Sequence, residues 1–423
     1  MATPKVGRFE EGVLWNFASL GVLSVCGLLL LRVIPQLYDA GALGVFESVW
    51  VVYIFASQLG SGGVDRSALR AIAEHRADRD AVGRIAFGAL LPVAAQSALV
   101  AGAVYLSRGF WAELVELPEV ADGLAWAAPG LFFFALNKVA LGIVNGLSRM
   151  RAYAVYQSLR YLAMLAGPFV VHALGWPAAR VAFLFTFAEG LLAVALAIEL
   201  ALVVPRPHGR WFDWTREHLR FGTRSLVSGV LLELNTRLDV WMIGLFGLGK
   251  VQIAYYAVAL HIAEGVFQLI TVLQSNFNPV LARHIAAREH AELTAFVRRG
   301  MRFTWLLMFG VAAVAVAGYS FGVGVLMGQP DFVEHSFWPF VWLMSGIALA
   351  AGYLPFQQVL LMANRPGWHT LFMCATVAVN AGFNALLIPR YGIAGAAIAT
   401  AICFLASALL IRTLAARVAG IRF

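Results

Sequence analysis

The chain has 423 residues, of which 61% are hydrophobic and only 13% are charged, and its mean hydropathy is +0.78. Soluble domains are about 45–50% apolar and about 25% charged, so this chain has too few charges to cover a water-exposed surface. The composition predicts an integral membrane protein and excludes a disordered chain, a disulfide scaffold, a coiled coil and a cytosolic enzyme. The net charge of +8 is explained by membrane topology, and we expect no nucleic-acid partner.

The chain contains a series of apolar runs bounded by charges or by Gly and Pro clusters. A bilayer core of about 30 Å requires roughly 20 apolar residues per helix. Twelve runs meet this requirement: 12–34, 45–64, 83–107, 124–147, 153–174, 180–203, 222–247, 251–279, 303–327, 337–361, 368–388 and 392–414. The predicted fold is an all-α polytopic membrane protein with about twelve transmembrane helices.

A short internal match indicates a repeat. The stretch from Arg70 to Ala73 after the second run recurs from Arg283 to Ala286 after the eighth. We therefore predict two six-helix lobes related by a parallel repeat, residues 1–205 and 222–423, joined by a cytoplasmic amphipathic linker at 206–221. Transporters with such repeats bind substrate near the bilayer midplane, between the lobes.

The predicted linker has two distinct faces. One carries aromatic side chains and the other carries arginines that can contact lipid phosphates: Trp211, Trp214 and His218 on the first, Arg210, Arg216 and Arg220 on the second. This pattern is typical of a helix at a membrane surface. Tethering of the lobes is the simpler hypothesis, and gating is the alternative.

Charge in the short loops predicts the orientation. Arginines gather in the loop between Arg66 and Arg84, whereas the loop between Glu113 and Asp122 is acidic. Basic loops face the cytoplasm. Both termini are therefore predicted to be cytoplasmic, in a multi-pass protein of the bacterial plasma membrane.

Several ionisable residues lie at membrane depth, where charges are costly and usually functional. Lys138 and Arg160 fall at comparable distances from the turn that joins their runs, and we expect them to form one anion site. The alternative is that Glu189 pairs with one of them as a structural ion pair. Glu233 and Arg237 stand four residues apart, so they can neutralise each other on one helix face.

The eighth run carries a polar stripe. Its members are three or four residues apart and share one helix face: His261, Glu264, Gln268, Thr271, Ser275 and Asn278. Polar groups in lipid would lack hydrogen-bonding partners, so the stripe either lines a water-filled cavity, which we favour, or packs on another polar helix. Tyr153, Gln157 and Arg160 repeat this spacing in the fifth run.

Other chemistry is not indicated. Cys26, Cys374 and Cys403 lie in apolar runs without metal-ligand spacing, so neither a metal site nor a cofactor is predicted. The chain has no nucleotide-binding or hydrolase motif, and we do not expect an enzyme. Transport would draw on an ion gradient or on the substrate's own concentration.

Three groups of residues form short motifs: Leu31, Arg32, Gly44, Val45 and Phe46, then Gly63, Val64, Asp65 and Arg66, then Leu238, Asp239, Ile243, Gly244, Tyr255, Tyr256 and Ala257. With these motifs the chain resembles a known family, the polysaccharide-type flippases of the multidrug/oligosaccharidyl-lipid/polysaccharide superfamily. The resemblance implies alternating-access flipping of a polyprenyl-pyrophosphate-linked oligosaccharide to the outer leaflet. It also implies that Arg32, Asp65, Arg66 and Asp239 serve gating or coupling.

The embedded residues suit such a substrate. Fixed cations would bind the pyrophosphate and polar side chains the sugars, and the predicted substrate-binding residues are Lys138, Arg160, Arg237, Gln157, Gln268 and Asn278. Glu264 and His261 are predicted to serve coupling or gating. The predicted partners are the lipid-linked oligosaccharide, membrane lipids and other polysaccharide-assembly proteins. A drug/proton or drug/sodium antiporter is the alternative function, and a membrane glycosyltransferase or ligase is a weaker one.

Overall fold

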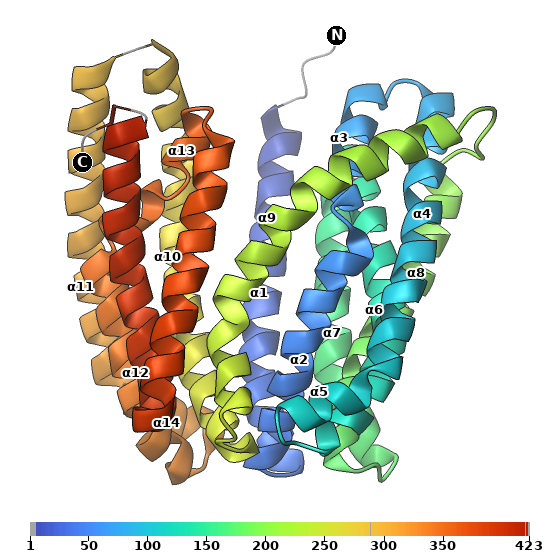
Figure 1. Cartoon of the computed structure of the whole chain (residues 1–423). Coiled ribbons are helices and arrows are strands. Elements are labelled where there is room, and N and C mark those ends of the chain that lie inside the picture. The colour runs from blue at the N-terminus through green and yellow to red at the C-terminus, as the bar shows by residue number, and fades with distance from the viewer. Residues whose placement is uncertain (1–5, 288, 419, 422–423) are drawn as a thin grey trace. The chain divides into compact units, whose positions relative to one another are not determined.

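The computed structural model describes residues 6–287, 289–418 and 420–421, and every regular element within them is helical. The chain divides into two compact units, Met1–Glu233 and Leu234–Phe423 (Figure 1). The termini at 1–5 and 422–423, which the topology prediction assigns to the cytoplasm, lie outside the described residues.

Unit 1 is a bundle around α6, which contacts α2, α3, α4 and α8 extensively. Its helices are α1 (Val6–Leu37), α2 (Ala40–Ser61), α3 (Val64–His75), α4 (Arg79–Leu106), α5 (Arg108–Leu114), α6 (Glu119–Gly146), α7 (Met150–Ala173), the 3₁₀ helix η1 (Ala178–Ala182) and α8 (Phe183–Val203), followed by α9 (Phe212–Leu245), which extends into unit 2.

Unit 2 consists of the end of α9 and of long helices that pack side by side, with α12 and α14 in extensive contact. Its remaining elements are α10 (Lys250–Ala287), α11 (His290–Met327), α12 (Pro330–Ala350), the 3₁₀ helix η2 (Leu354–Phe356), α13 (Val359–Met362) and α14 (Pro366–Val418).

The twelve predicted runs all lie on helices. Among the described residues, eight helices are long and apolar enough to cross a membrane, or nine when the bent pair of α12 with residues Leu354–Met362 counts as one span. The charged helices α7 and α9 account for two more of the predicted runs. The segment α14 holds the last two, because Gly392, at φ 58° and ψ −138°, interrupts its helical path. The chain is a multi-pass membrane protein, and each of the twelve predicted runs corresponds to helical structure in its described residues.

Two predicted boundaries need correction. The tenth run was predicted to continue to residue 361, but α12 ends at Ala350 and the chain bends by 62° before it continues. Gly352 and Pro355 lie in this bend and disfavour a straight helix. In unit 1, α2 ends at two residues with positive φ, Gly62 at 54° and Gly63 at 72°, so the basic segment that follows forms a separate helix, α3.

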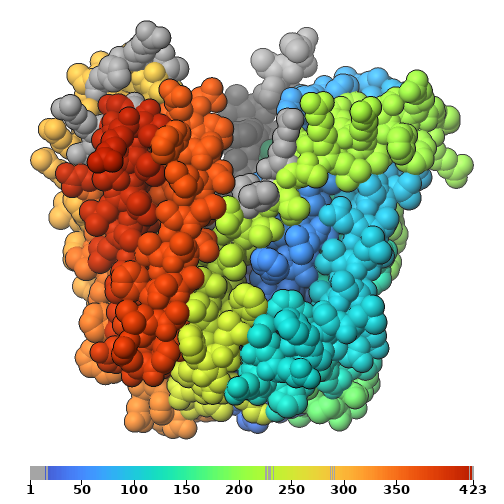
Figure 2. Space-filling model, in the orientation of Figure 1, coloured from blue at the N-terminus to red at the C-terminus, as the bar shows by residue number. Residues whose placement is uncertain are grey.

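The predicted linker at 206–221 lies on unit 1. Its aromatic face packs on α3 and α4, where His218 is buried against Ser67 Oγ at 2.8 Å and Thr215 donates to the Gly88 carbonyl at 3.0 Å. Figures 1 and 2 show this first part of α9 lying across those helices. The helix then continues to Leu245, and Gly222 allows its close approach to the end of α2, since a Cβ there would meet the Gly62 oxygen at 2.3 Å.

Candidate functional site

A buried ion pair joins α7 to α8 inside unit 1. Arg160 Nε lies 2.8 Å from Glu189 Oε1, and the side chains are only 9% and 3% exposed. A second guanidinium nitrogen donates to Glu189 Oε2 at 3.2 Å, and the buried Asn137 of α6 donates to the same oxygen at 2.8 Å. The charge of Arg160 is therefore compensated within the unit, and three helices meet at one carboxylate.

The polar contacts of Arg160 continue along α7. Arg160 donates to Gln157 Oε1 at 3.3 Å, and Gln157 donates to the Tyr153 hydroxyl at 3.2 Å. The spacing that the sequence showed on this helix thus corresponds to a chain of side-chain hydrogen bonds on one face.

Lys138 has different partners from Arg160. Its Nζ donates to Gln58 Oε1 at 3.1 Å and to Ser61 Oγ at 3.3 Å, and it lies 4.0 Å from Asp65 Oδ2. Gln58 in turn donates to Glu233 at 3.2 Å. Lys138 therefore faces α2 and α3, where its hydrogen-bond acceptors are neutral and the Asp65 carboxylate is at the outer limit of an ion pair.

The two predicted cations therefore do not share ligands in unit 1. Lys138 follows Asn137 on α6, and consecutive helical side chains point about 100° apart, so Asn137 meets Glu189 while Lys138 meets Gln58. The pairing of Arg160 with Glu189 is the geometry of the alternative hypothesis, a structural ion pair. The prediction of one joint anion site finds no direct contact in its support.

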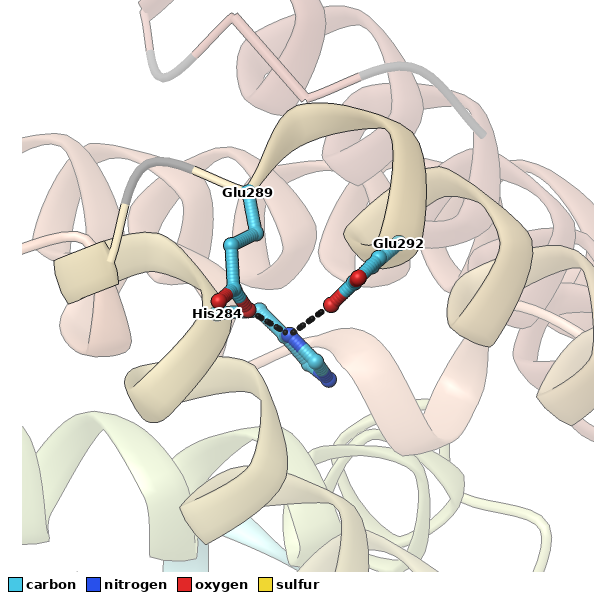
Figure 3. A group of neighbouring side chains, drawn as sticks. All are labelled: His284, Glu289 and Glu292. Atoms are coloured by element: carbon cyan, nitrogen blue, oxygen red, sulfur yellow. Dashed lines mark hydrogen bonds and ion pairs between the residues drawn. The ribbon is translucent and has the colours of Figure 1, made fainter.

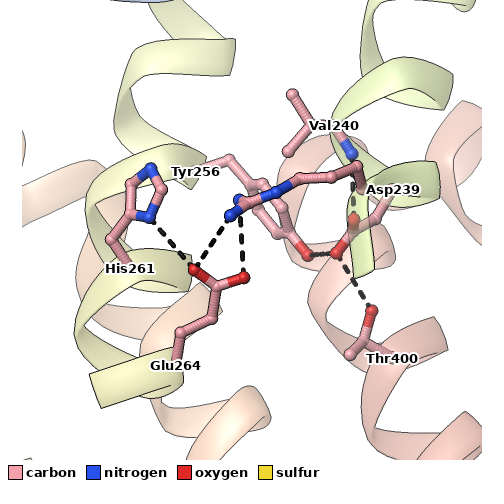
Figure 4. A network of polar contacts seen from close by, with 7 residues as sticks. Asp239, Val240, Tyr256, His261, Glu264 and Thr400 are labelled. Atoms are coloured by element: carbon pink, nitrogen blue, oxygen red, sulfur yellow. Dashed lines mark hydrogen bonds and ion pairs between the residues drawn. The ribbon is translucent and has the colours of Figure 1, made fainter. Parts of the chain in front are cut away.

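Unit 2 has an ion pair of its own, shown in Figure 4. Arg237 NH1 lies 3.4 Å from Glu264 Oε1, and His261 Nδ1 lies 3.1 Å from Glu264 Oε2. The side chains of Arg237, Glu264 and His261 are 15%, 31% and 23% exposed. The sequence placed His261 and Glu264 on one face of α10, and α9 supplies the guanidinium that meets them.

Beside this group, Asp239 of α9 is buried and fully engaged. Its carboxylate accepts hydrogen bonds from the Tyr256 hydroxyl, from Thr400 Oγ1 at 3.3 Å and from the Val240 backbone N–H at 3.0 Å. Figure 4 shows these partners converging from three helices, α9, α10 and α14. Asp239 thus ties the core of unit 2 together.

The other predicted residues lie apart from these groups. Asn278 donates to Gln358 Oε1 at 2.8 Å, whereas Gln268 is exposed on α10. Arg66 is exposed on α3, and Arg32 is half-buried on α1. The polar stripe of α10 is thus embedded near its two ends and exposed in its middle, at Gln268, Thr271 and Ser275.

Sequence reasoning missed the neutral partners: Asn137, Gln58, Ser61 and Thr400. Each is a polar residue within an apolar run, and this position is the one sequence signal that could have identified them as candidates. Buried polar groups require a partner. Their partners lie on other helices, so no spacing within one run reveals the pairing.

Comparison with known proteins gives two results from sequence and a third from solved structures. The profile described as polysaccharide biosynthesis protein matches residues 37–330. A probable multidrug resistance protein NorM from Mesorhizobium japonicum is 25% identical over 206 residues, which are 46% of this chain and 43% of that protein. The chain thus aligns with less than half the length of this relative.

Solved structures share the fold. The lipid II flippase MurJ in an inward closed conformation superposes with a TM-score of 0.75 at 13% identity, covering 95% of this chain and 86% of that one. An inward-facing multidrug resistance MATE family transporter of the MOP superfamily gives 0.73 at 16% identity, covering 94% and 92%. The chain therefore has the two-lobed, twelve-helix fold of these proteins.

Proposed function

Because the chain belongs to the polysaccharide biosynthesis protein family, we propose that it flips a polyprenyl-pyrophosphate-linked oligosaccharide from the inner to the outer leaflet of the bacterial plasma membrane. Three observations support this: the family match over most of the chain, the fold shared with a lipid II flippase, and cations embedded in apolar helices. In this scheme both termini are cytoplasmic, because basic loops favour the cytoplasmic side.

The observation that carries the proposal is the environment of Lys138. Arg160 is matched at 2.8 Å by Glu189, so its charge is already used within unit 1. Lys138 donates to neutral acceptors at 3.1 and 3.3 Å, and the Asp65 carboxylate is 4.0 Å away. A pyrophosphate, whose desolvation needs a fixed cation, can therefore recruit Lys138 at less cost to existing contacts.

Other residues take supporting roles in this scheme. Arg160 and Gln157 position α7 beside the substrate rather than neutralise it. Gln268 and Asn278 on the α10 stripe hydrogen-bond the sugars. The group of Arg237, Glu264 and His261 serves coupling, because its contacts are longer and more exposed than those in unit 1. Asp239, Asp65, Arg66 and Arg32 serve gating.

The test is leaflet exchange in vesicles. The purified chain is reconstituted with a fluorescent polyprenyl-pyrophosphate oligosaccharide, and a membrane-impermeant quencher reports the outer-leaflet fraction with time. We expect protein-dependent exchange, a loss of at least about tenfold in Lys138→Gln, since one charge-assisted contact is worth about 1.5–3 kcal/mol, and partial activity in Lys138→Arg. Arg70→Gln, an exposed cation on α3, is the matched control and should behave as wild type. Leaflet exchange at the wild-type rate in Lys138→Gln would show that Lys138 is not part of the substrate site.

A drug antiporter is the second candidate, because the NorM relative aligns with nearly half of the chain and unit 2 carries a coupled acidic group. Vesicles loaded with ethidium and given a proton or sodium gradient distinguish the two. Gradient-driven movement of the cation without any exchange of the lipid-linked sugar would favour the antiporter and reject the flippase.

A further inference from the structure

Three metal-ligand side chains converge at the turn between α10 and α11, shown in Figure 3. His284 lies in the last turn of α10, Glu289 immediately precedes α11, and Glu292 lies in the first turn of α11. His284 Nδ1 is 2.6 Å from Glu289 Oε2 and 3.7 Å from Glu292 Oε2. One ligand atom from each residue falls within 4.8 Å of the others.

The imidazole of this group is held in place. Its side chain is only 11% exposed, and its ring packs beside Phe296, with the ring centroids 6.2 Å apart. The backbone N–H of Glu289 donates to the His284 carbonyl at 3.1 Å, a direct link between the residue before α11 and the last turn of α10. The carboxylates of Glu289 and Glu292 are 44% and 68% exposed, so the group is rigid on one side and open to water on the other.

The composition of the group favours a cation. One imidazole nitrogen and two carboxylate oxygens, one from each of three residues, lie within 4.8 Å of one another. All three are atom types that bind divalent metal ions. Because the two carboxylates face water, an ion can reach them from solution.

We propose that His284, Glu289 and Glu292 form a divalent-cation site of the zinc class, which fastens the start of α11 to the end of α10. Zinc binds imidazole nitrogen and carboxylate oxygen at about 2.0–2.2 Å, so ligand atoms around it lie about 3–3.6 Å apart. To reach these distances, the exposed side chains of Glu289 and Glu292 rotate, so that the short His284–Glu289 contact lengthens and the longer contacts shorten. Three protein ligands leave a position for water, and the metal displaces the imidazole proton.

The chemistry of the ligand set selects this class. One nitrogen with two carboxylate oxygens suits zinc, whereas magnesium prefers oxygen ligands alone and keeps its waters. The site lies outside every polar group assigned to transport above, so its presence or absence is independent of the proposed function.

The test measures zinc on the full-length chain in detergent, with any affinity tag removed. A Cys374→Ser background is used because that thiol is exposed and can bind zinc alone. Chelator-treated protein is dialysed against micromolar Zn²⁺ in excess Mg²⁺, and bound metal is counted by mass spectrometry. We expect about one zinc per chain and a raised unfolding temperature.

Two variants decide the assignment. Glu292→Gln alters an exposed side chain and should leave the fold intact, yet weaken zinc binding at least about tenfold, as should His284→Ala. Glu74→Gln, an exposed carboxylate on α3, is the control and should bind as the parent does. Absence of zinc from the parent protein, or equal zinc in the parent and in Glu292→Gln, would overturn the proposal.

Discussion

The two units each contain an arginine–glutamate pair between neighbouring helices, and the pairs differ in burial. Arg160 and Glu189 of unit 1 meet at 2.8 Å with almost no exposure. Arg237 and Glu264 of unit 2 meet at 3.4 Å, and their side chains are 15% and 31% exposed. The same two side-chain types are therefore almost fully buried in one unit and partly accessible in the other.

The partners that complete each pair reinforce this difference. In unit 1 the third member is Asn137, a neutral amide that does not change its protonation state. In unit 2 it is His261, an imidazole that does. A buried charge left without its partner costs several kcal/mol, whereas an exposed pair contributes about 1 kcal/mol or less. Substitutions in unit 1 should therefore act mainly on the free energy of unfolding, and those in unit 2 mainly on the pH dependence of transport.

The largest effect is expected from Arg160→Gln. This change leaves Glu189 buried without its ionic partner, and should lower the free energy of unfolding by about 3–5 kcal/mol. The double variant Arg160→Gln with Glu189→Gln removes both charges and should recover most of that loss. Thermal unfolding in detergent measures both. Equal unfolding temperatures for the single and double variants would show that the pair is not structural.

A smaller loss is expected from Asn137→Leu, whose side chain branches at the same carbon but cannot donate to Glu189. Removing one partner of a buried hydrogen bond costs about 1–3 kcal/mol. The loss should shrink when Glu189→Gln is combined with it, because a neutral amide is less costly to leave underbonded. Purely additive losses in the double variant would argue against coupling between Asn137 and Glu189.

Glu264→Gln should act on transport more than on stability. We expect a smaller loss of unfolding free energy than in Arg160→Gln, because the Glu264 side chain is 31% exposed whereas that of Glu189 is 3% exposed. The amide keeps the shape of the carboxylate but cannot bind a proton, so any pH or gradient dependence of leaflet exchange should flatten. The charged or titratable groups that face Glu264 are Arg237 and His261, with Asp239 and Tyr256 beside them. An unchanged pH profile in a well-folded variant would leave Glu264 a packing role only.

The smallest effect is expected from His261→Asn. It retains a donor near Glu264 but removes the imidazole. A contact of about 1 kcal/mol or less should move the midpoint of the pH profile by less than about one unit. The same reconstituted vesicles report the shift. A complete loss of transport would show that His261 itself carries the proton.

Much of the fold was predicted from the sequence. Each apolar run of about 20 residues became a helical segment, and the break at Gly392 was correctly placed between the last two. The bend after Ala350 and the separate helix α3 were not predicted. Local sequence shows where helices weaken, as at Gly352 and at Gly62, but packing decides how far the chain turns there.

Only some contacts between the candidate site residues could be predicted from the sequence. Spacing correctly put His261 and Glu264 on one face of α10, because that relation lies within one helix. Lys138 and Arg160 were expected together because they lie at similar depths, but depth says nothing about direction. Their contacts with Gln58 and Glu189 follow from the rotation of α6 and α7 about their own axes.

The sequence by itself determined that this chain enters a membrane, where its helical segments run and which side chains share a helix face, because apolar length and a 3.6-residue period are properties of one segment. Only the tertiary structure decided which faces meet. It gave Arg160 a buried carboxylate, left Lys138 among neutral groups and placed the aromatic face of α9 on unit 1. The physical reason is that the interaction energy of a charge depends on the distance to its partner and on the exclusion of water. Both are set by the packing of helices that are distant in sequence.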